Sequence, residues 1–246
     1  MKYAVFVAVC FSVSIAMGQG INSGLPTPPP GATVFSQIQE MSGWGSCNAP
    51  SCAGGSGNGS YWMAQFQQQP SLSGDSTEIF NSGVWDNALW YMKLGSGHDS
   101  ATNLLWDFWV QVDSNALTGA QALEYDSFQF LNGYNYMIGS QCNIAAGVWD
   151  TWDELHGHWI HTTIPCTGFS PGTWHHIQWY VTTNHTTQQY TYVTLVLDGK
   201  VHNLNQTYSA KNIGWNSNIG VQYQLDVNAS GQGYSEWVDL SKLTVW

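Results

Sequence analysis

The sequence of 246 residues predicts an all-β protein, a two-sheet antiparallel β-sandwich of the jelly-roll type. From about residue 61 onward, short segments rich in Val, Trp, Tyr, Phe and Thr alternate with turn residues, which is typical of many short strands. No stretch sustains an amphipathic helical period over three turns, and no internal repeat is present. The Asp-Gly pair in LDGKV at 197–201 predicts a tight hairpin between two of these strands.

The N-terminus indicates the compartment. Residues 1–18, MKYAVFVAVCFSVSIAMG, combine one Lys, an apolar run and a small-x-small end, so they predict a signal peptide that is cut before Gln19. Residues 19–33 contain LPTPPPGA and predict a Pro/Gly-rich linker, and residues 34–246 predict a single domain. No later run is long and apolar enough to span a membrane. We therefore expect a secreted protein, extracellular, periplasmic or on the cell surface, without membrane insertion.

Four cysteines remain after removal of the predicted signal peptide, namely Cys47, Cys52, Cys142 and Cys166. In an oxidising compartment, four cysteines imply two disulfides. We expect the pairs Cys47–Cys52 and Cys142–Cys166, because each pair flanks one loop-rich segment. Zinc is the alternative, but C-x₄-C without a second close pair is poor spacing for a zinc site.

The predicted strands are, in chain order, 61–67, 77–81, 87–94, 103–112, 121–130, 134–141, 158–164, 173–182, 190–198, 201–207, 218–227 and 235–246. Several of them alternate between an apolar face and a polar face. In NLLWDFWVQV at 103–112, Trp106 and Phe108 fall on the apolar face, and Asp107 and Trp109 on the other. The apolar faces predict the core between the two sheets.

The polar faces of these strands predict the binding surface. They gather Gln and acidic residues beside aromatic ones, whereas a plain solvent face would carry Lys, Thr, Ser and Glu. Gln offers both a donor and an acceptor to sugar hydroxyls, and an aromatic ring suits the face of a pyranose. We expect one concave, sugar-binding sheet face with Tyr91, Asp107, Trp109, Gln111, Glu124, Asp126, Gln129, His176, Gln178, Gln222, Gln224 and Asp226.

The segment ALEYDSFQF at 122–130 holds two of the acids. Strict alternation would place Glu124 and Asp126 on one face with Phe128 and Phe130, which mixes carboxylates with phenylalanines. One extra residue at Ser127–Phe128 would instead put Glu124, Asp126 and Gln129 on the polar face. We therefore expect a β-bulge at this point, a feature found often beside active sites.

The charge balance excludes some partners. The chain has sixteen acidic residues, no arginine and a formal net charge of −11. Nucleic acids and polyuronates would meet a surface of their own sign, with no guanidinium group to bridge them. Neutral partners remain, and the 14 Trp and 12 Tyr residues suit stacking on sugar rings.

These residues resemble the concanavalin A-like lectin/glucanase superfamily, whose two-sheet jelly roll forms a sugar cleft on its concave sheet. EYDSFQ at 124–129 resembles the E-x-D-x-x-E strand of laminarinase- and lichenase-type glycoside hydrolases. That resemblance implies Glu124 as nucleophile and Asp126 as its neighbour, while Gln129 stands in the acid/base position and cannot deliver a proton. CNAPSCAGG, GSQC and GTWHHIQW are also similar to secreted bacterial β-sandwich proteins of uncharacterised function.

The sequence thus predicts a lectin-like protein that binds a neutral polysaccharide such as a β-glucan or hemicellulose, in an oligomeric state left open. A glycoside hydrolase is the first alternative, with Glu124 as nucleophile and Asp226 as acid/base by resemblance to jelly-roll glucanases and xylanases. A structural or adhesive cell-surface protein is the second. No cofactor is expected, but Asp239 resembles the late-strand Asp that ligates a structural Ca²⁺ in many jelly-roll modules, so calcium is a candidate.

Overall fold

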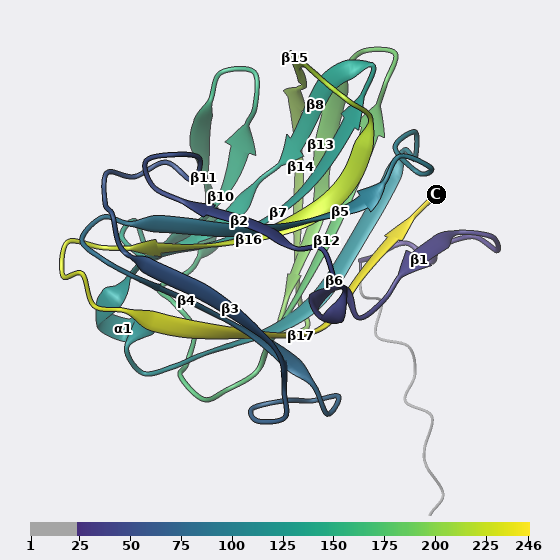
Figure 1. The fold of residues 1–246 in the computed structure, drawn as a ribbon. Helices are drawn as coiled ribbons and strands as arrows, with labels where there is room; N and C mark the ends of the chain where they lie inside the picture. The colour runs from purple at the N-terminus through teal and green to yellow at the C-terminus, as the bar shows by residue number, and fades with distance from the viewer. Residues whose placement is uncertain (1–23) are drawn as a thin grey trace, which may run out of the picture.

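The computed structural model describes residues 24–246, which form two antiparallel sheets packed face to face (Figure 1). The first sheet has the strand order β14-β13-β12-β6-β17-β4-β3, with β1 also paired to β17. The second has the order β11-β10-β9-β7-β16-β5-β2, and β8 pairs with both β7 and β15. The predicted all-β jelly-roll sandwich is confirmed. The predicted signal peptide and residues 19–23 lie outside the described residues.

The strands of the first sheet are β1 (Thr33–Phe35), β3 (Ser60–Gln67), β4 (Ser76–Ser82), β6 (Asn103–Val112), β12 (His175–Asn184), β13 (Gln189–Leu197), β14 (Lys200–Ser209) and β17 (Tyr234–Val245). Those of the second are β2 (Gly45–Asn48), β5 (Asn87–Gly95), β7 (Ala120–Leu131), β8 (Gly133–Ile138), β9 (Ser140–Asn143), β10 (Val148–Asp153), β11 (His158–Pro165), β15 (Lys211–Trp215) and β16 (Asn218–Val227). Two short helical turns, η1 (Ile38–Glu40) and α1 (Ala116–Gly119), lie between strands.

Most strands have bounds close to the predicted ones, and β6 and β16 agree with them at both ends. The single strand predicted at 134–141 is divided into β8 and β9, and four strands lie outside the predicted ranges, namely β1, β2, β10 and β15. Three of these are only three to five residues long, and β2 lies in a Gly- and Ser-rich stretch whose composition is typical of a loop. They form because a neighbouring strand supplies their hydrogen-bond partners, which the local sequence does not reveal.

Apolar side chains from both sheets meet between them and form the core. Trp106 and Phe108 of β6 are buried there, with ring centroids 4.2 Å apart, and Tyr223 of β16 packs against both. Truncating such an aromatic side chain to Ala costs on the order of 3–5 kcal/mol, so this layer fixes the position of one sheet on the other. The remaining residues of each strand consequently point away from the core, toward the outer face of their own sheet.

The predicted bulge at Ser127–Phe128 in strand β7 is wrong, and the register shift in its pairing with β16 lies instead near its start, between Ala120 and Ala122. Its pairing with β16 runs without a shift from Leu123↔Leu225 to Phe130↔Asn218. Glu124 and Asp126 therefore share the outer face with Phe128 and Phe130, and Gln129 points to the core side. There Gln129 donates a hydrogen bond to the Ala101 carbonyl at 2.7 Å and is 3.0 Å from the His185 ring nitrogen Nε2.

The outer face of β7 accepts phenylalanines because its neighbours make room for them. Gly220 lies opposite Phe128 on β16, and a Cβ at this glycine would come within 2.3 Å of the Phe128 ring. Trp215 of β15 packs edge-on against Phe130, with ring centroids 4.9 Å apart. The mixed face of carboxylates and phenylalanines is thus a packed arrangement.

Both predicted disulfides are present. Cys47–Cys52 closes the loop that follows β2, and Cys142–Cys166 joins β9 to the residue after β11. Disulfides are typical of oxidising compartments, which agrees with an extracellular protein, and secretion itself stays a prediction. Within residues 24–246, no helix is long and apolar enough to cross a membrane.

Candidate functional site

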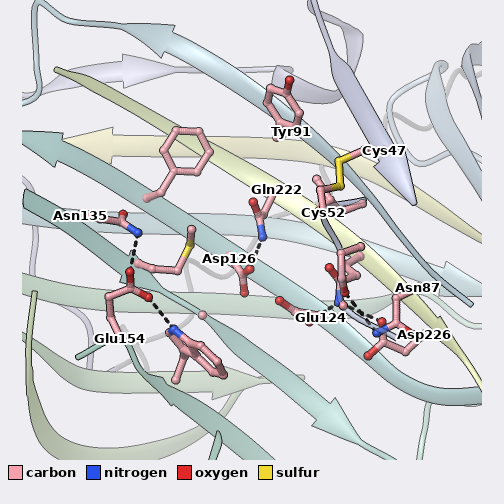
Figure 2. Close-up of a pocket in the computed structure, with 18 of the residues that line it drawn as sticks. Cys47, Cys52, Asn87, Tyr91, Glu124, Asp126, Asn135, Glu154, Gln222 and Asp226 are labelled. Atoms are coloured by element: carbon pink, nitrogen blue, oxygen red, sulfur yellow. Dashed lines mark hydrogen bonds between the residues drawn. A yellow bond between two sulfur atoms is a disulfide. The ribbon is translucent and has the colours of Figure 1, made fainter. Parts of the chain in front are cut away.

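A cleft of about 780 Å³ lies on the outer face of the second sheet (Figure 2). Its floor is formed by the central strands β7, β16 and β5, and its walls by the Cys47–Cys52 loop, β8, β15 and the β10–β11 hairpin. The structure brings six of the predicted site residues together here: Tyr91, Glu124, Asp126, Gln222, Gln224 and Asp226. They converge because β5, β16 and β7 are neighbours and their outward-facing positions are in register.

Two glutamines of β16 bridge the three carboxyl groups on the floor. Gln224 lies opposite Glu124, and its Nε2 donates to Glu124 Oε2 at 2.6 Å and to Asp226 Oδ1 at 2.9 Å. Gln222 lies opposite Asp126 and donates to its Oδ2, while the Ser140 N–H donates to Asp126 Oδ1 at 3.0 Å. Each amide therefore fixes the carboxylate on the neighbouring strand, and the floor is ordered without any ligand.

Burial raises the pKa values of these three acids. Burial raises the pKa of Glu124 well above its usual range, and the charges of Asp126 and Asp226 raise it further. Burial also raises the pKa of Asp126 to about 6 and that of Asp226 to about 7, although hydrogen bonds from the two glutamines act the other way. At neutral pH the three groups consequently share at least one proton.

A fourth carboxyl group, Glu154, lines the cleft at the end of β10. It accepts hydrogen bonds from Asn135 Nδ2 and from the Trp152 indole N–H, both at 2.7 Å (Figure 2). Burial raises the pKa of Glu154. Glu154 was not among the predicted site residues, because β10 was not predicted. The strand pattern is nevertheless present in the sequence, where Trp149, Thr151 and Asp153 alternate with Asp150 and Trp152.

Aromatic side chains flank the polar floor. Trp152 and Trp159 meet on the β10–β11 hairpin with ring centroids 5.0 Å apart, and Trp215 stands on β15 with 56% of its surface exposed. Tyr91 lines the cleft from β5, near the ammonium of Lys93 at 5.7 Å from its ring centroid. Rings at the edges and hydrogen-bonding groups on the floor together make a surface that fits a sugar ring.

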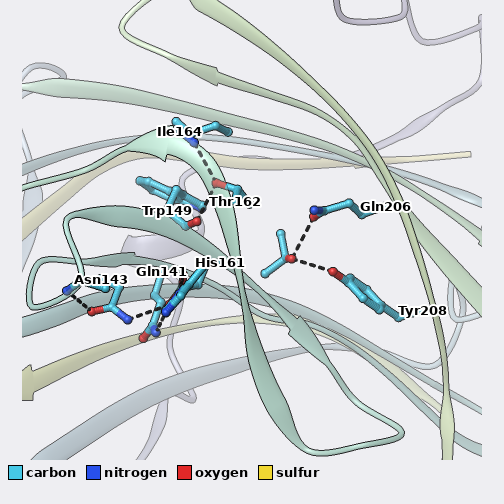
Figure 3. A network of polar contacts seen from close by, with 11 residues as sticks. Gln141, Asn143, Trp149, His161, Thr162, Ile164, Gln206 and Tyr208 are labelled. Atoms are coloured by element: carbon cyan, nitrogen blue, oxygen red, sulfur yellow. Dashed lines mark hydrogen bonds and ion pairs between the residues drawn. The ribbon is translucent and has the colours of Figure 1, made fainter.

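A buried polar network continues the floor beyond β7 (Figure 3). Asp150 of β10 is buried, accepts hydrogen bonds from Gln141 at 2.9 Å and Asn143 at 2.8 Å, and lies 2.6 Å from His161 Nδ1. Gln141 in turn lies opposite Glu124. On the core side of β10, Thr151 is within 3.0 Å of the Gln206 and Tyr208 side chains of the first sheet. These contacts hold β10, and with it the wall that carries Trp152 and Glu154.

Five predicted site residues do not belong to this cleft. Asp107, Trp109 and Gln111 lie on β6, and His176 and Gln178 on β12, so all five face outward from the first sheet, on the other side of the sandwich. There Asp107 pairs with His176 Nε2 at 2.7 Å and Lys242 Nζ at 3.3 Å, and accepts a hydrogen bond from Gln178 at 3.0 Å. Trp109 stacks on His176 with centroids 4.3 Å apart.

The prediction of one shared face was therefore wrong for these five residues, as it was for Gln129. Alternation along a strand separates a core side from an outer side. It does not tell which sheet contains the strand, and both sheets of a sandwich have a polar outer face.

Asp239, the predicted calcium ligand, lies on β17 away from the cleft. Its carboxylate accepts hydrogen bonds from the Ser71 and Ser73 hydroxyls and from the N–H groups of Leu72, Ser73 and Leu240. Burial acts to raise the pKa of Asp239, but these donors lower it below its ordinary value. The donors occupy the oxygen positions that a calcium ion would need, so the residues present do not fit calcium. They tie the 71–73 turn to β17.

Comparison with known proteins supports the fold. No family model matches the chain, and no curated protein matches its sequence. The solved structure of an endo-beta-1,4-glucuronan lyase from the fungus Trichoderma reesei is similar with a TM-score of 0.52 at 9% identity, over 85% of this chain and 94% of that one. The lectin-like defense protein arcelin-5 from Phaseolus vulgaris has a TM-score of 0.46 at 9% identity, over 87% and 98% of the two chains. At 9% identity the similarity to the lyase shows the fold alone, a two-sheet jelly-roll sandwich, as the sequence predicted.

Proposed function

We propose that the cleft binds a carbohydrate chain. The observation that carries this proposal is the cleft itself: polar side chains that are already ordered by hydrogen bonds form its floor, and aromatic rings stand at its edges. Carboxylates and amides can bond sugar hydroxyls, and indole rings can stack on the apolar faces of sugar rings. A preformed floor also lowers the entropy cost of binding.

The charge of the cleft restricts the class of glycan. Glu124, Asp126, Glu154 and Asp226 line it, and the chain has no arginine to pair with the carboxylates of a uronic acid. A polyanionic chain would meet like charges in a partly desolvated site. That leaves neutral glycans, such as the β-glucans and hemicelluloses expected from the sequence, and cationic ones.

The test is binding of purified protein to a panel of β-glucans, xylans, mannans and amino-sugar polymers, followed by two matched tryptophan variants. Trp215→Ala removes a ring from the edge of the cleft and should weaken binding by about tenfold. Trp109→Ala removes a ring from the outer face of the other sheet and should leave binding unchanged. Equal losses in the two variants, with both proteins folded, would place the binding surface elsewhere.

Glycoside hydrolysis is a second candidate, favoured by one specific observation. Glu124 and Asp226 accept hydrogen bonds from the same nitrogen of Gln224, at 2.6 and 2.9 Å, so two carboxyl groups meet in the cleft. Burial raises the pKa of Asp226 to about 7, which suits a general acid. A shared donor keeps the two accepting oxygens within about 5.5 Å of each other, which is too close for the spacing of about 6.5–9.5 Å of an inverting glycosidase and compatible with a retaining one.

Glu124→Gln separates the two candidates. It keeps the shape and much of the hydrogen-bonding reach of the side chain but removes a nucleophile. For a binding protein, reducing ends appear with neither protein, and affinity falls only modestly. Release of reducing ends by the wild type that disappears in Glu124→Gln, while binding persists, would establish the hydrolase.

A further inference from the structure

The cleft gathers acidic groups that form no ion pair with a cationic residue of the described chain. Four carboxyl groups line it, and Lys93 is the one cationic residue among the described lining residues. Within residues 24–246, neither Lys nor His comes within ion-pair distance of Glu124, Asp126 or Asp226. Outside the cleft, by contrast, Asp107 lies within ion-pair distance of His176 and Lys242, and Asp150 within ion-pair distance of His161.

The floor is also rich in acceptors and poor in donors. Glu124 and Asp226 each receive a hydrogen bond from the single Nε2 of Gln224, although a carboxylate has about four acceptor positions. In the same cleft Asn135 is 3% exposed, and its Oδ1 has no hydrogen-bond partner while its Nδ2 is bound to Glu154. A ligand that completes this site must therefore bring donors, and preferably a positive charge.

We propose that the sugar chain bound in this cleft carries protonated amino groups, as in a chain of unacetylated glucosamine-type units, with one ammonium placed over Glu124, Asp126 and Asp226. This inference rests on the proposed function and narrows its ligand to amino sugars. An ammonium group supplies three donors and one positive charge to acids that have no cationic partner among the described residues. The aromatic rings of Tyr91, Trp152 and Trp159 add surfaces that attract a cation as well as a sugar face.

A neutral glycan fits less well, for a physical reason. Its hydroxyl groups donate hydrogen bonds but bring no positive charge to the acids of the group that are ionised. An ammonium instead offsets the repulsion between Glu124 and its acidic neighbours, and in a partly buried site that attraction is stronger than in water.

The test compares three β-1,4-linked oligomers of equal length by calorimetry at neutral pH: glucosamine, its N-acetylated counterpart, and glucose. They differ at one substituent of each ring, so the comparison isolates the amine. We expect the glucosamine oligomer to bind at least about tenfold more tightly than the other two, and its advantage to shrink as salt is added.

Two variants locate the effect. Glu124→Gln and Asp226→Asn should each weaken binding of the glucosamine oligomer more than binding of the glucose oligomer, so the preference for the amine shrinks. Asp198→Asn is the control, because it removes the same charge from a side chain that is 53% exposed and lies outside the cleft. A preference for the amine that survives both cleft variants would overturn the proposed site.

The outcomes also separate this inference from the proposed function. Equal affinity for all three oligomers would refute the amine and leave carbohydrate binding standing. No binding of any oligomer or polysaccharide in the panel would refute both. The comparison of ligands uses the wild-type protein, so it tests the preference for the amine even where a variant does not fold.

Discussion

Among single residues outside the cleft, Glu236 is a carboxyl group enclosed in the core. It has no exposed surface, its Oε2 accepts a hydrogen bond from the Tyr125 hydroxyl at 2.6 Å, and its Oε1 has no partner among the described residues. Burial raises the pKa of Glu236 to about 8, although the hydrogen bond from Tyr125 acts to lower it. At neutral pH the group is mostly protonated, which keeps an unpaired charge out of the core.

We expect the free energy of unfolding to fall as pH rises from about 4.5 to about 8. In that range the unfolded chain releases the Glu236 proton, whose ordinary pKa is 4.5, while the folded protein holds it up to about 8. Asp126 and Asp226, with pKa values of about 6 and about 7, act in the same direction. Glu236→Gln should flatten the dependence by a few kcal/mol in urea unfolding across this pH range. If the free energy of unfolding depends on pH in the same way in the wild type and in Glu236→Gln, the buried Glu236 is not the source of the pH dependence.

The acids of the cleft should titrate as a coupled group. Burial is the main cause of the raised pKa of Glu124, and the charge of Asp126 is the next. Asp126→Asn removes that charge, so the pKa of Glu124 should fall without reaching its ordinary value, because the burial remains. Carbon-13 NMR titration of the glutamate carboxyl groups measures this, with Asp198→Asn as the control. An unchanged pKa of Glu124 would mean that the two groups are not coupled.

Among the strands, β6 and β16 could be predicted well and β7 could not. Trp106 and Tyr223 belong to unbroken apolar faces, so alternation alone places them in the core. The outer face of β7 mixes Asp126 with Phe128. The sequence pattern instead predicts a bulge that would place the carboxylates and the phenylalanines on opposite faces. What makes the mixed face stable is Gly220 on the neighbouring strand, and a single strand does not reveal its partner.

That pairing predicts a strong effect of a small substitution on β16. A Cβ at Gly220 would lie 2.1 Å from the Met92 carbonyl oxygen and 2.3 Å from the Phe128 ring, and a backbone atom cannot move away easily. Gly220→Ala should therefore destabilise the protein by about 1–3 kcal/mol. Gly97→Ala is the matched control, since nothing lies within 4 Å of its Cβ position. Chemical unfolding that shows the same stability for both variants would refute the β7–β16 register.

For the molecule as a whole, the sequence predicted a two-sheet sandwich and one polar binding face, but not how the strands are divided between the two sheets. Asp107 and Glu124 are both acidic residues flanked by apolar and aromatic residues in a strand. They nevertheless lie on opposite sides of the sandwich. That difference depends on pairings between strands far apart in the chain. The wall that carries Trp215 depends on such a pairing too, because β15 pairs with the distant strand β8. Glu154 instead follows β10, which pairs with its chain neighbours β9 and β11.

The two disulfides should serve stability and binding to different degrees. Cys142–Cys166 closes a loop with a sequence separation of 24 and joins two strands of the second sheet at the core, whereas the separation of Cys47–Cys52 is 5. In the chain-entropy model, replacing both cysteines by Ala should cost roughly 3 kcal/mol for the longer loop and roughly 2 kcal/mol for the shorter one.

For glycan affinity, loss of the Cys47–Cys52 disulfide should matter more than loss of the Cys142–Cys166 disulfide. Cys47 and Cys52 line the cleft with Ala53, Gly54 and Gly55, so losing their bond frees a wall of the site, while Cys142 and Cys166 lie outside the lining. The Cys47→Ala/Cys52→Ala protein should thus lose more affinity for the glycan, and the Cys142→Ala/Cys166→Ala protein more stability. Urea unfolding and calorimetry on the same two proteins measure both quantities. If affinity follows stability in both, the loop has no separate part in binding, and the cleft is formed by the sheet alone.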